Sequence, residues 1–175
     1  MTDFKLIAPY KKFEKQVLEY IEEFLKHNSQ INGTAGLHRC NSYDEWLLKL
    51  EKSLDVSNIQ EDNVPLNTYF LIRKQDSKII GMITIRHKLN EILLNRGGHI
   101  GYSIRPTERK RGCGTLILKL GLEKCRELNL NKVLITCDKI NVASAKVIQN
   151  NNGILENEVF NELFSEITQR YWISL

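Results

Sequence analysis

The sequence predicts a mixed α/β domain in which helices cover the faces of a sheet of about six to seven strands. Apolar residues recur with helical spacing in some segments and with strand spacing in others, and the two kinds of segment follow one another along the chain. The chain has 175 residues, and 42% of them are hydrophobic, which suits a single domain with one sizeable core. We therefore expect residues 1–175 to form one domain with about four helices.

The first third of the chain is expected to hold a short strand and two helices. Lys5–Ala8 alternates like a strand, and Tyr10–His27 carries apolar residues at helical spacing with charges between them. The stretch Asn28–Asn41 contains two glycines and is expected to be a loop. Asn41 or Ser42 can cap a second helix, whose apolar face is Trp46, Leu47, Leu50 and Leu54.

The middle of the chain predicts a hairpin and a third strand. The polar segment Ser57–Asn67 is expected to be a surface connection. Thr68–Arg73 and Lys78–His87 are rich in strand-forming residues and are separated by a short polar turn. Arg96-Gly97-Gly98 then opens the strand His99–Ile104, which Pro106 ends because proline cannot donate to a sheet.

The last third alternates helices with strands. Its expected elements are the helix Thr115–Leu128, the nearly continuous apolar strand Val133–Cys137, the helix Val142–Gln149, and a closing hairpin of Ile154–Phe160 and Thr168–Leu175. The run from Asn150 to Gly153 ends the second of these helices, because Asn or Gly can adopt the left-handed conformation that caps a helix.

Charge and cysteine content indicate the cellular compartment and the classes of partner that can be expected. Lys and Arg number 25 against 21 acidic residues, and the net charge of +4 is partly clustered at Arg105, Arg109, Lys110 and Arg111. A small nucleic-acid binder is the weaker alternative, because the net charge is low and no basic stripe with interleaved aromatic residues occurs. The four cysteines form no CxxC pair, and the N-terminus has no apolar segment of a secretory signal. No stretch is long and apolar enough for a membrane span. We expect free thiols, a cytoplasmic location, and no membrane or nucleic-acid partner.

The loop Arg109–Thr115 carries the strongest chemical signal. Gly112 and Gly114 allow the backbone to take conformations that other residues resist, so that several N–H groups can turn toward one anion. The helix that begins near Thr115 adds its unpaired N–H groups and the positive end of its dipole. We interpret this loop as a phosphate cradle flanked by basic side chains.

Other phosphate-binding loops fit less well. The Walker pattern GxxxxGK[ST] does not occur, and the dinucleotide pattern GxGxxG/A would place the bulky Ile117 at its third small position. Asp138, at the end of the next strand, stands where a ribose-binding acid would be expected, which keeps a dinucleotide site open. The remaining alternative is an ordinary loop whose glycines serve only to turn the chain.

These residues resemble a known family. Arg109-x-x-Gly112-x-Gly114, after a strand that ends in proline and before an amphipathic helix, is similar to the coenzyme A pyrophosphate loop of the GNAT (Gcn5-related) N-acetyltransferases. The similarity continues through Val133–Cys137 and from Asn141 to Gly153, and is weaker over Thr68–Ile104 and around Tyr171-Trp172.

The resemblance implies a fold and a co-substrate. The expected sheet changes from antiparallel to parallel pairing, and the strand His99–Ile104 splays from Val133–Cys137 so that acetyl-CoA enters the gap. The residues that match the family's coenzyme site are Ser103, Ile104, Arg109, Lys110, Arg111, Gly112, Cys113, Gly114, Thr115, Asn141 and Ser144. No metal is implied.

The resemblance also implies an activity, the direct transfer of an acetyl group to a primary amine of a small molecule or a peptide. His99 matches the position at which many relatives carry the base, although a hydrogen-bonded strand histidine is the alternative. The backbone N–H near Ile104 matches the oxyanion donor. Ile148 stands where many relatives have a tyrosine that serves as the acid for the leaving thiolate, so the group with this role is not evident here.

Four further expectations remain open at this point. Cys137 and Cys113 suggest an acyl-cysteine mechanism, which we consider the weaker alternative to direct transfer. The missing tyrosine keeps a non-catalytic acetyl-CoA sensor as the alternative function. Arg86, His87 and Asn90 could line the acceptor pocket, or could be a solvated strand end. By analogy with the family a homodimer is possible.

Overall fold

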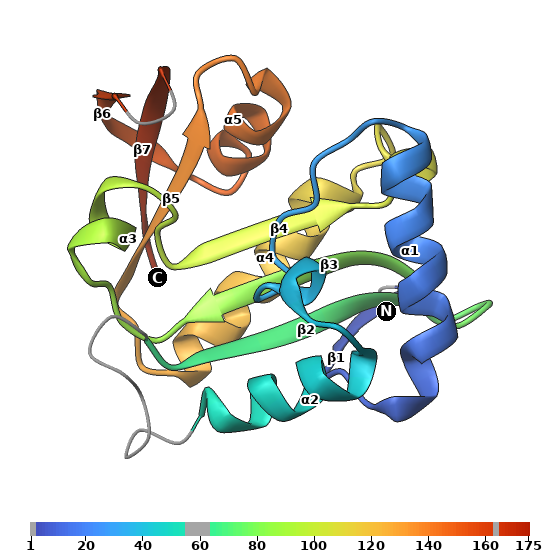
Figure 1. Ribbon diagram of the computed structural model, residues 1–175. Coiled ribbons are helices and arrows are strands. Elements are labelled where there is room, and N and C mark those ends of the chain that lie inside the picture. Colours follow the sequence, from blue (N-terminus) through green and yellow to red (C-terminus); the bar gives the residue numbers. More distant parts are fainter. Residues whose placement is uncertain (1–2, 55–63, 163–164) are drawn as a thin grey trace.

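The computed structural model describes residues 3–54, 64–162 and 165–175. Within these ranges the chain forms two antiparallel sheets and five α-helices (Figure 1). The first sheet has the strand order β1-β2-β3-β4, and the second has the order β5-β7-β6. The predicted mixed α/β class is confirmed, and the seven strands agree with the six to seven that were expected. Of the expected surface connection Ser57–Asn67, residues 57–63 lie outside the described residues.

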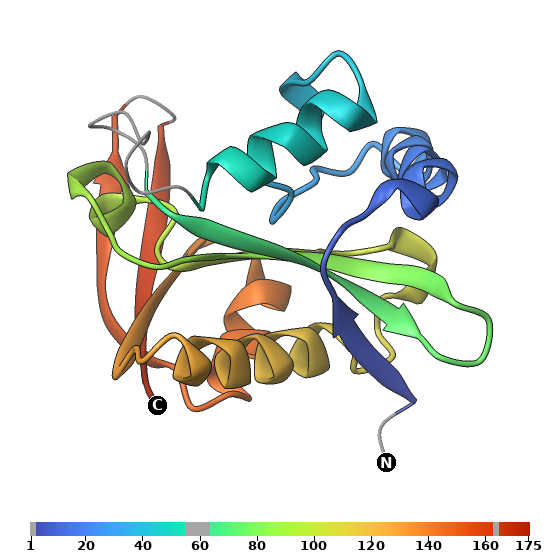
Figure 2. The ribbon, with the colours of Figure 1, turned by 90° about the horizontal axis from the view of Figure 1, so that it is seen from below.

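The first sheet separates two cores. Its strands are β1 (Phe4–Ile7), β2 (Leu66–Arg73), β3 (Lys78–Arg86) and β4 (Ile100–Ile104). Helices α1 (Glu14–Lys26) and α2 (Tyr43–Lys52) cover one face, and α4 (Cys113–Glu127) covers the other (Figure 2). Because side chains alternate across a strand, Met82 packs under α1 and α2 whereas its neighbour Ile83 packs toward α4.

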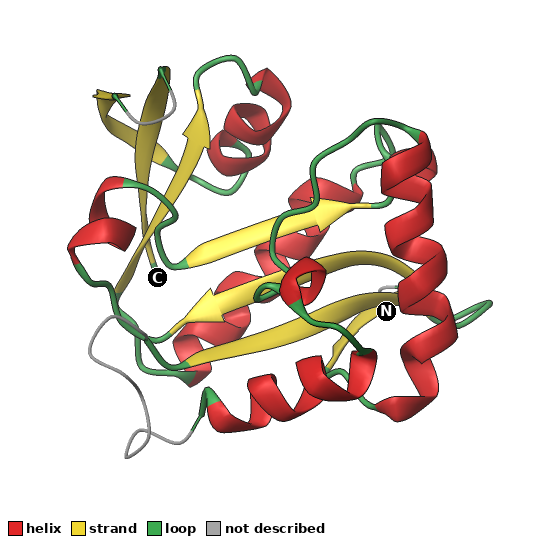
Figure 3. Cartoon of the chain, viewed as in Figure 1, coloured by secondary structure: helices red, strands yellow, loops and turns green. Residues whose placement is uncertain are grey.

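The second sheet follows α4. It consists of β5 (Lys132–Asp138), β6 (Ile154–Asn161) and β7 (Glu166–Ser174), and α5 (Val142–Gln149) connects β5 to β6 (Figure 3). Strand β7 pairs with both neighbours, so the predicted closing hairpin is confirmed. Asn152, with φ of 65°, takes the left-handed position after α5 that the Asn-rich run predicted.

The two sheets meet at one point and then diverge. The His99 N–H donates to Leu134 O at 2.7 Å, and the Leu134 N–H donates to the His99 ring at 2.9 Å. Beyond this junction β4 and β5 belong to different sheets, and they spread apart toward their C-terminal ends (Figure 1). The expected splayed pair is present, but all ladders between described strands are antiparallel, so the two bonds at His99 stand in place of the expected parallel ladder.

Several short elements differ from the sequence predictions. Helix α3 (Glu91–Asn95) was not predicted, because one turn of helix is too short to show a periodic pattern. The first predicted helix starts with the 3-10 turn η1 (Lys11–Phe13), and α4 begins two residues earlier than expected. Two further 3-10 turns, η2 (Leu37–Arg39) and η4 (Pro106–Glu108), lie in predicted loops. Ser42 caps α2 as predicted, by accepting from the Glu45 N–H.

All four cysteines are free thiols, as the spacing predicted. None of the helices in the described ranges combines the length and apolar content that a bilayer span requires.

Candidate active site

The glycine loop adopts the conformation that an anion cradle needs. Gly112 has φ of 78° and is the N-cap residue of α4, and the first helical bond runs from the Leu116 N–H to Gly112 O. The N–H groups of residues 113–115 therefore have no partner within the helix, and no backbone carbonyl of the described residues accepts them. A Cβ atom at Gly112 would have no atom within 4 Å, so the space beside the loop is open.

Gly114 has a different role. A Cβ atom there would lie 2.9 Å from a methyl group of Val147, so the missing side chain lets α5 pack against the first turn of α4. The buried Asn151 strengthens this contact by donating to the carbonyls of Thr115 and Val147. Gly114 thus allows the start of α4 to lie against the body of α5.

Arg109 holds the loop rather than leaving its charge free. Its guanidinium donates to Ile104 O at 3.1 Å and to Ser29 Oγ at 2.8 Å, and lies 5.3 Å from the centre of the Phe24 ring. These contacts tie the loop to the end of β4 and to the segment after α1. Lys110 and Arg111 remain exposed beside the open space.

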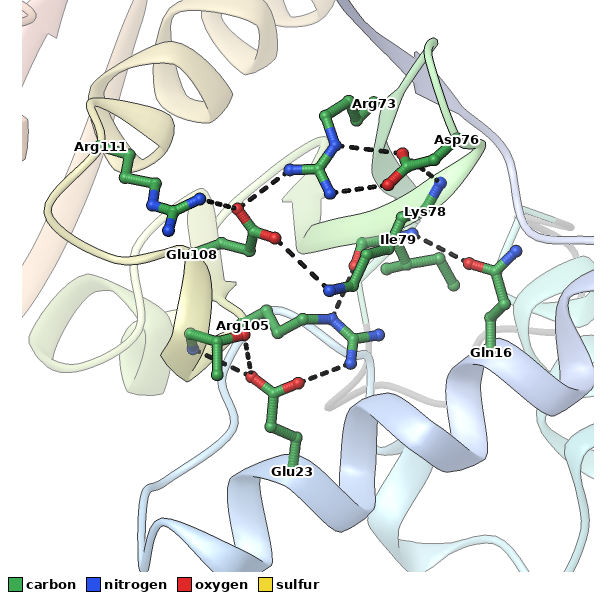
Figure 4. A network of polar contacts seen from close by, with 10 residues as sticks. Gln16, Glu23, Arg73, Asp76, Lys78, Ile79, Arg105, Glu108 and Arg111 are labelled. Atoms are coloured by element: carbon green, nitrogen blue, oxygen red, sulfur yellow. Dashed lines mark hydrogen bonds and ion pairs between the residues drawn. The ribbon is translucent and has the colours of Figure 1, made fainter.

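A network of ion pairs holds the residues beside the loop (Figure 4). The buried Glu108 carboxylate accepts from Arg73 at 3.0 Å and from Arg111 at 3.2 Å, and pairs with Lys78 at 3.4 Å. Arg73 also binds Asp76. The hairpin of β2 and β3 is thereby connected to the residues that precede α4.

A second pair joins β4 to α1. Arg105 is only 4% exposed and donates to Glu23 at 2.7 Å and to Ile79 O at 2.9 Å. Glu23 also accepts from the N–H and the hydroxyl of Thr107. Burial by itself would raise the pKa of Glu23, but the hydrogen bonds from Thr107 and Arg105 outweigh it and keep the pKa below its ordinary value.

The backbone of β4 offers hydrogen-bonding groups to the gap. The Arg105 N–H donates to Ile80 O on β3. Since the groups of successive strand residues point in opposite directions, those of Ile104 and Tyr102 point away from β3 and toward β5. Ser103 faces the other way, with its hydroxyl against Tyr20 and Asn32 O. The gap is therefore lined by Tyr102 and Ile104, whereas the sequence pointed to Ser103 and Ile104.

The first turn of α5 forms the opposite wall of the gap. Asn141 caps this helix by accepting from the Ser144 N–H at 3.1 Å. The Ser144 hydroxyl lies 3.0 Å from the Tyr102 hydroxyl, which reaches it from β4. Two positions selected from the sequence, Asn141 and Ser144, thus lie together at the gap. Tyr102 joins them, although no sequence pattern distinguished it from other strand tyrosines.

His99 lies at the junction of the two sheets and is only 7% exposed. Burial, and to a smaller extent the charge of Arg86, lower the pKa of His99 to about 4. Its Nδ1 accepts the Leu134 N–H, so the neutral ring carries its hydrogen on Nε2. A ring in this tautomer has no free lone pair for a substrate proton. This geometry favours a structural role for His99 over the role of base that its position suggested.

The lowered pKa of His99 predicts a loss of stability in acid. The unfolded ring titrates near 6.5 and the folded ring near 4, so the contribution of His99 is complete above pH 6.5 and falls as the pH drops toward 4. We expect wild-type protein to lose about 2 kcal/mol of unfolding free energy over this range through His99. In His99→Asn the amide oxygen can still accept the Leu134 N–H and cannot titrate.

The measurement is urea unfolding of both proteins at several pH values. Groups other than His99 titrate equally in the two proteins, so the difference between them isolates this ring. Parallel curves from pH 6.5 to pH 4 would show that His99 does not titrate with a lowered pKa.

Neither the position of Ile148 nor the two cysteines offers a group that is ready for proton transfer or nucleophilic attack. Ile148 is fully buried in the core, so its position has no access to a ligand. Burial raises the pKa of Cys137 to about 11, and burial also raises the pKa of Cys113. Both thiols are therefore neutral near pH 7, which disfavours the acyl-cysteine alternative.

The three residues expected to bind the acceptor each have a structural partner. Arg86 donates to Gly98 O at 3.0 Å, and burial lowers its pKa. His87 pairs with the Asn67 side chain at 2.7 Å. Asn90 caps α3 by accepting from the Leu93 N–H. They gather at the end of β3, near the junction of the two sheets.

Known proteins show what the chain is similar to. A family model described as an acetyltransferase (GNAT) domain matches residues 15–153, a span that runs from α1 through α5. Among curated proteins, no sequence matches the chain at a significant level. No group of three or more His, Cys, Asp or Glu residues in the described part of the chain is arranged to hold a metal.

Solved structures match over nearly the whole chain. The ribosomal-protein-S5-alanine acetyltransferase from Vibrio fischeri has a TM-score of 0.73 and 16% identity, covering 99% of this chain and 94% of its own. A ribosomal L7/L12 α-N-protein acetyltransferase, RimL, in complex with coenzyme A, has a TM-score of 0.72 and 14% identity, covering 100% and 96%. The microcin C7 self-immunity acetyltransferase MccE, in complex with acetyl-CoA and AMP, has a TM-score of 0.68 and 18% identity, covering 98% and 92%. At these identities the likeness concerns the fold.

Proposed function

The chain belongs to the GNAT acetyltransferase family, and we propose that it transfers the acetyl group of acetyl-CoA directly to a primary amine of a small molecule or a peptide. The observation that carries this proposal is the open loop at Gly112, which Arg109 ties to the end of β4 and Gly114 packs against α5. Two of the similar structures hold coenzyme A or acetyl-CoA, which agrees with this co-substrate.

The coenzyme would lie along the gap. Its pyrophosphate would be bound by the N–H groups of residues 113–115, with Lys110 and Arg111 adding positive charge. Its pantetheine arm would pair with the Ile104 N–H and with the backbone of Tyr102, which point away from β3, whereas the Ile104 carbonyl already accepts from Arg109. Asn141 and Ser144 would line the opposite side of the arm. This arrangement places the thioester inside the gap, between the glycine loop and the junction of the sheets.

The reaction needs a neutral amine and a donor for the developing oxyanion. A backbone N–H of β4 that faces the gap is the donor we propose. Because the His99 ring is held by Leu134, we assign it the role of a positioning residue that fixes the angle between β4 and β5. The amine would then lose its proton to water. Arg86, His87 and Asn90 would shape the inner end of the gap rather than contact the amine.

The acceptor is proposed only by class. The relatives named above include enzymes that act on ribosomal proteins, and another similar structure is a spermidine N-acetyltransferase. Peptide N-termini and small amines are therefore the two groups to test.

We expect thiol release from acetyl-CoA when the protein is given an effective amine from a panel of peptides with free N-termini, polyamines and small primary amines. The thiol is detected by a colorimetric reagent, and the acetylated amine by mass spectrometry. The control reaction omits the amine and measures hydrolysis. Calorimetric binding of acetyl-CoA without turnover on any amine would favour the sensor alternative instead.

A further inference from the structure

We propose that Tyr102 is a further catalytic residue, whose hydroxyl donates a hydrogen bond to the coenzyme A sulfur as the acetyl group departs. This inference rests on the proposed function. It addresses a gap in the chemistry, because the resemblance implies an acid at the position of Ile148, whose side chain is an apolar group fully buried in the core.

Tyr102 lies at the correct depth in the gap. His99 and Leu134 join β4 to β5, and Tyr102 and Cys137 each lie three residues beyond this junction on their own strands. At about 3.3 Å per strand residue, both are about 10 Å from the junction. The Tyr102 side chain crosses from β4 to α5, where its hydroxyl lies 3.0 Å from Ser144 Oγ. A pantetheine arm that follows the backbone of Tyr102 would bring its sulfur past this hydroxyl.

The hydroxyl pair has a hydrogen to give. Tyr102 and Ser144 share one hydrogen bond, and either oxygen can be its donor. Two hydroxyls carry two hydrogens, so one remains for another acceptor. Ser144 also lies beside the Cys137 thiol. A neutral thiol sulfur is a weak acceptor, so a thiolate with full negative charge would compete successfully for this hydrogen.

Tyr102 acts by hydrogen bonding and keeps its proton. Burial raises the pKa of Tyr102, so the hydroxyl remains protonated across the working pH range. It can donate a hydrogen bond, but it does not transfer its proton completely. When the tetrahedral intermediate collapses, the C–S bond breaks and both its electrons go to sulfur. The thiolate is stabilised by the Tyr102 hydroxyl and takes its proton from water after release. Starting from the neutral amine, the nitrogen loses one proton to water as the amide forms, and water returns one proton to the thiolate, so the step is balanced.

The test measures the thiol pKa of bound coenzyme A, by following the ultraviolet absorbance of its thiolate as the pH is raised. Tyr102→Phe keeps the ring and removes only the hydroxyl. We expect the bound thiol to have a pKa about one unit higher in Tyr102→Phe than in wild-type protein, since a hydrogen bond to a charged group is of this size. We also expect kcat to fall about 10-fold to 10²-fold, with KM for acetyl-CoA changed less than about threefold.

Tyr69→Phe is the matched control. Tyr69 on β2 pairs with Ile83, which pairs with Tyr102, so the two tyrosines lie in one row across the sheet. Both are half-buried against the α4 core, but Tyr69 lies near Lys124 rather than at the gap. We expect Tyr69→Phe to leave the bound thiol pKa and kcat at wild-type values.

The outcomes separate this inference from the proposed function. If wild-type protein does not bind coenzyme A, both are overturned. If coenzyme A binds and its thiol titrates identically in wild-type protein and in Tyr102→Phe, the role of Tyr102 is overturned while the proposed function stands. If Tyr69→Phe lowers kcat as much as Tyr102→Phe, the effect comes from the packing of the sheet, and the role of Tyr102 is likewise overturned.

Discussion

Gly112→Val is expected to weaken the binding of acetyl-CoA about 10²-fold. Gly112 has φ of 78°, a conformation that costs a β-branched residue about 1–3 kcal/mol. The chain can relieve this cost by rotating the peptide groups around residue 112, which turns N–H groups away from the anion. Each lost hydrogen bond to a phosphate costs about 1.5–3 kcal/mol. The new side chain would also fill the open space beside the loop. Isothermal calorimetry measures the change.

The control for this variant is Gly36→Val. Gly36 has the same φ of 78° and is the N-cap of η2, far from α4 in the chain. A Cβ atom there meets only the flexible end of Lys49, at 3.1 Å. The two substitutions thus impose the same backbone strain, and we expect both to lower the unfolding free energy by a similar amount. Only Gly112→Val should weaken acetyl-CoA binding, and equal affinities in the two variants would remove the loop from the coenzyme site.

Most of the fold was predictable because its signals are local. The helix Val142–Gln149 has the predicted ends, since Asn141 caps it and the Asn-rich run ends it. The hairpin of β2 and β3 follows from strand-forming residues on both sides of a polar turn. Helix α3 was missed because five residues carry no periodicity. The compartment and the oligomeric state stay predictions.

The site was predictable only in part, because its contacts join residues far apart in the chain. The glycine loop can be recognised from its composition, and its conformation agrees with the prediction. The basic residues beside it did not reveal their partners: Arg105 binds Glu23, which lies 82 residues earlier. Tyr102 meets Ser144 across 42 residues, and this contact joins β4 to α5. Side chains that act through such contacts have no local pattern.

Glu23→Gln is expected to destabilise the protein by about 3 kcal/mol. The Glu23 carboxylate accepts from Arg105 with one oxygen and from Thr107 with the other. A glutamine must turn its NH₂ group toward one of these donors, so one hydrogen bond is lost whichever way it lies. The Arg105 guanidinium, 4% exposed, would also keep its charge without a counter-charge. Urea unfolding at pH 7 measures the loss.

Asp44→Asn provides the same chemical change at an exposed pair. Asp44 binds Lys11 at 2.7 Å, and both side chains are more than half exposed to solvent. Exposed pairs contribute about 0–1 kcal/mol, so the control should lose far less stability than Glu23→Gln. Similar losses in the two variants would mean that burial of the Glu23 pair adds nothing.

The pH dependence distinguishes loss of charge from loss of packing. The pKa of Glu23 is lowered by folding, so its contribution is complete above the ordinary value of 4.5 and declines as the pH falls below it. The difference between wild-type protein and Glu23→Gln should therefore shrink in acid.

Arg105 and Thr107 immediately precede the coenzyme loop, and Arg105 is held over the Tyr20 ring of α1. Because this pair anchors the start of the loop to α1, Glu23→Gln should also weaken acetyl-CoA binding, whereas Asp44→Asn should not.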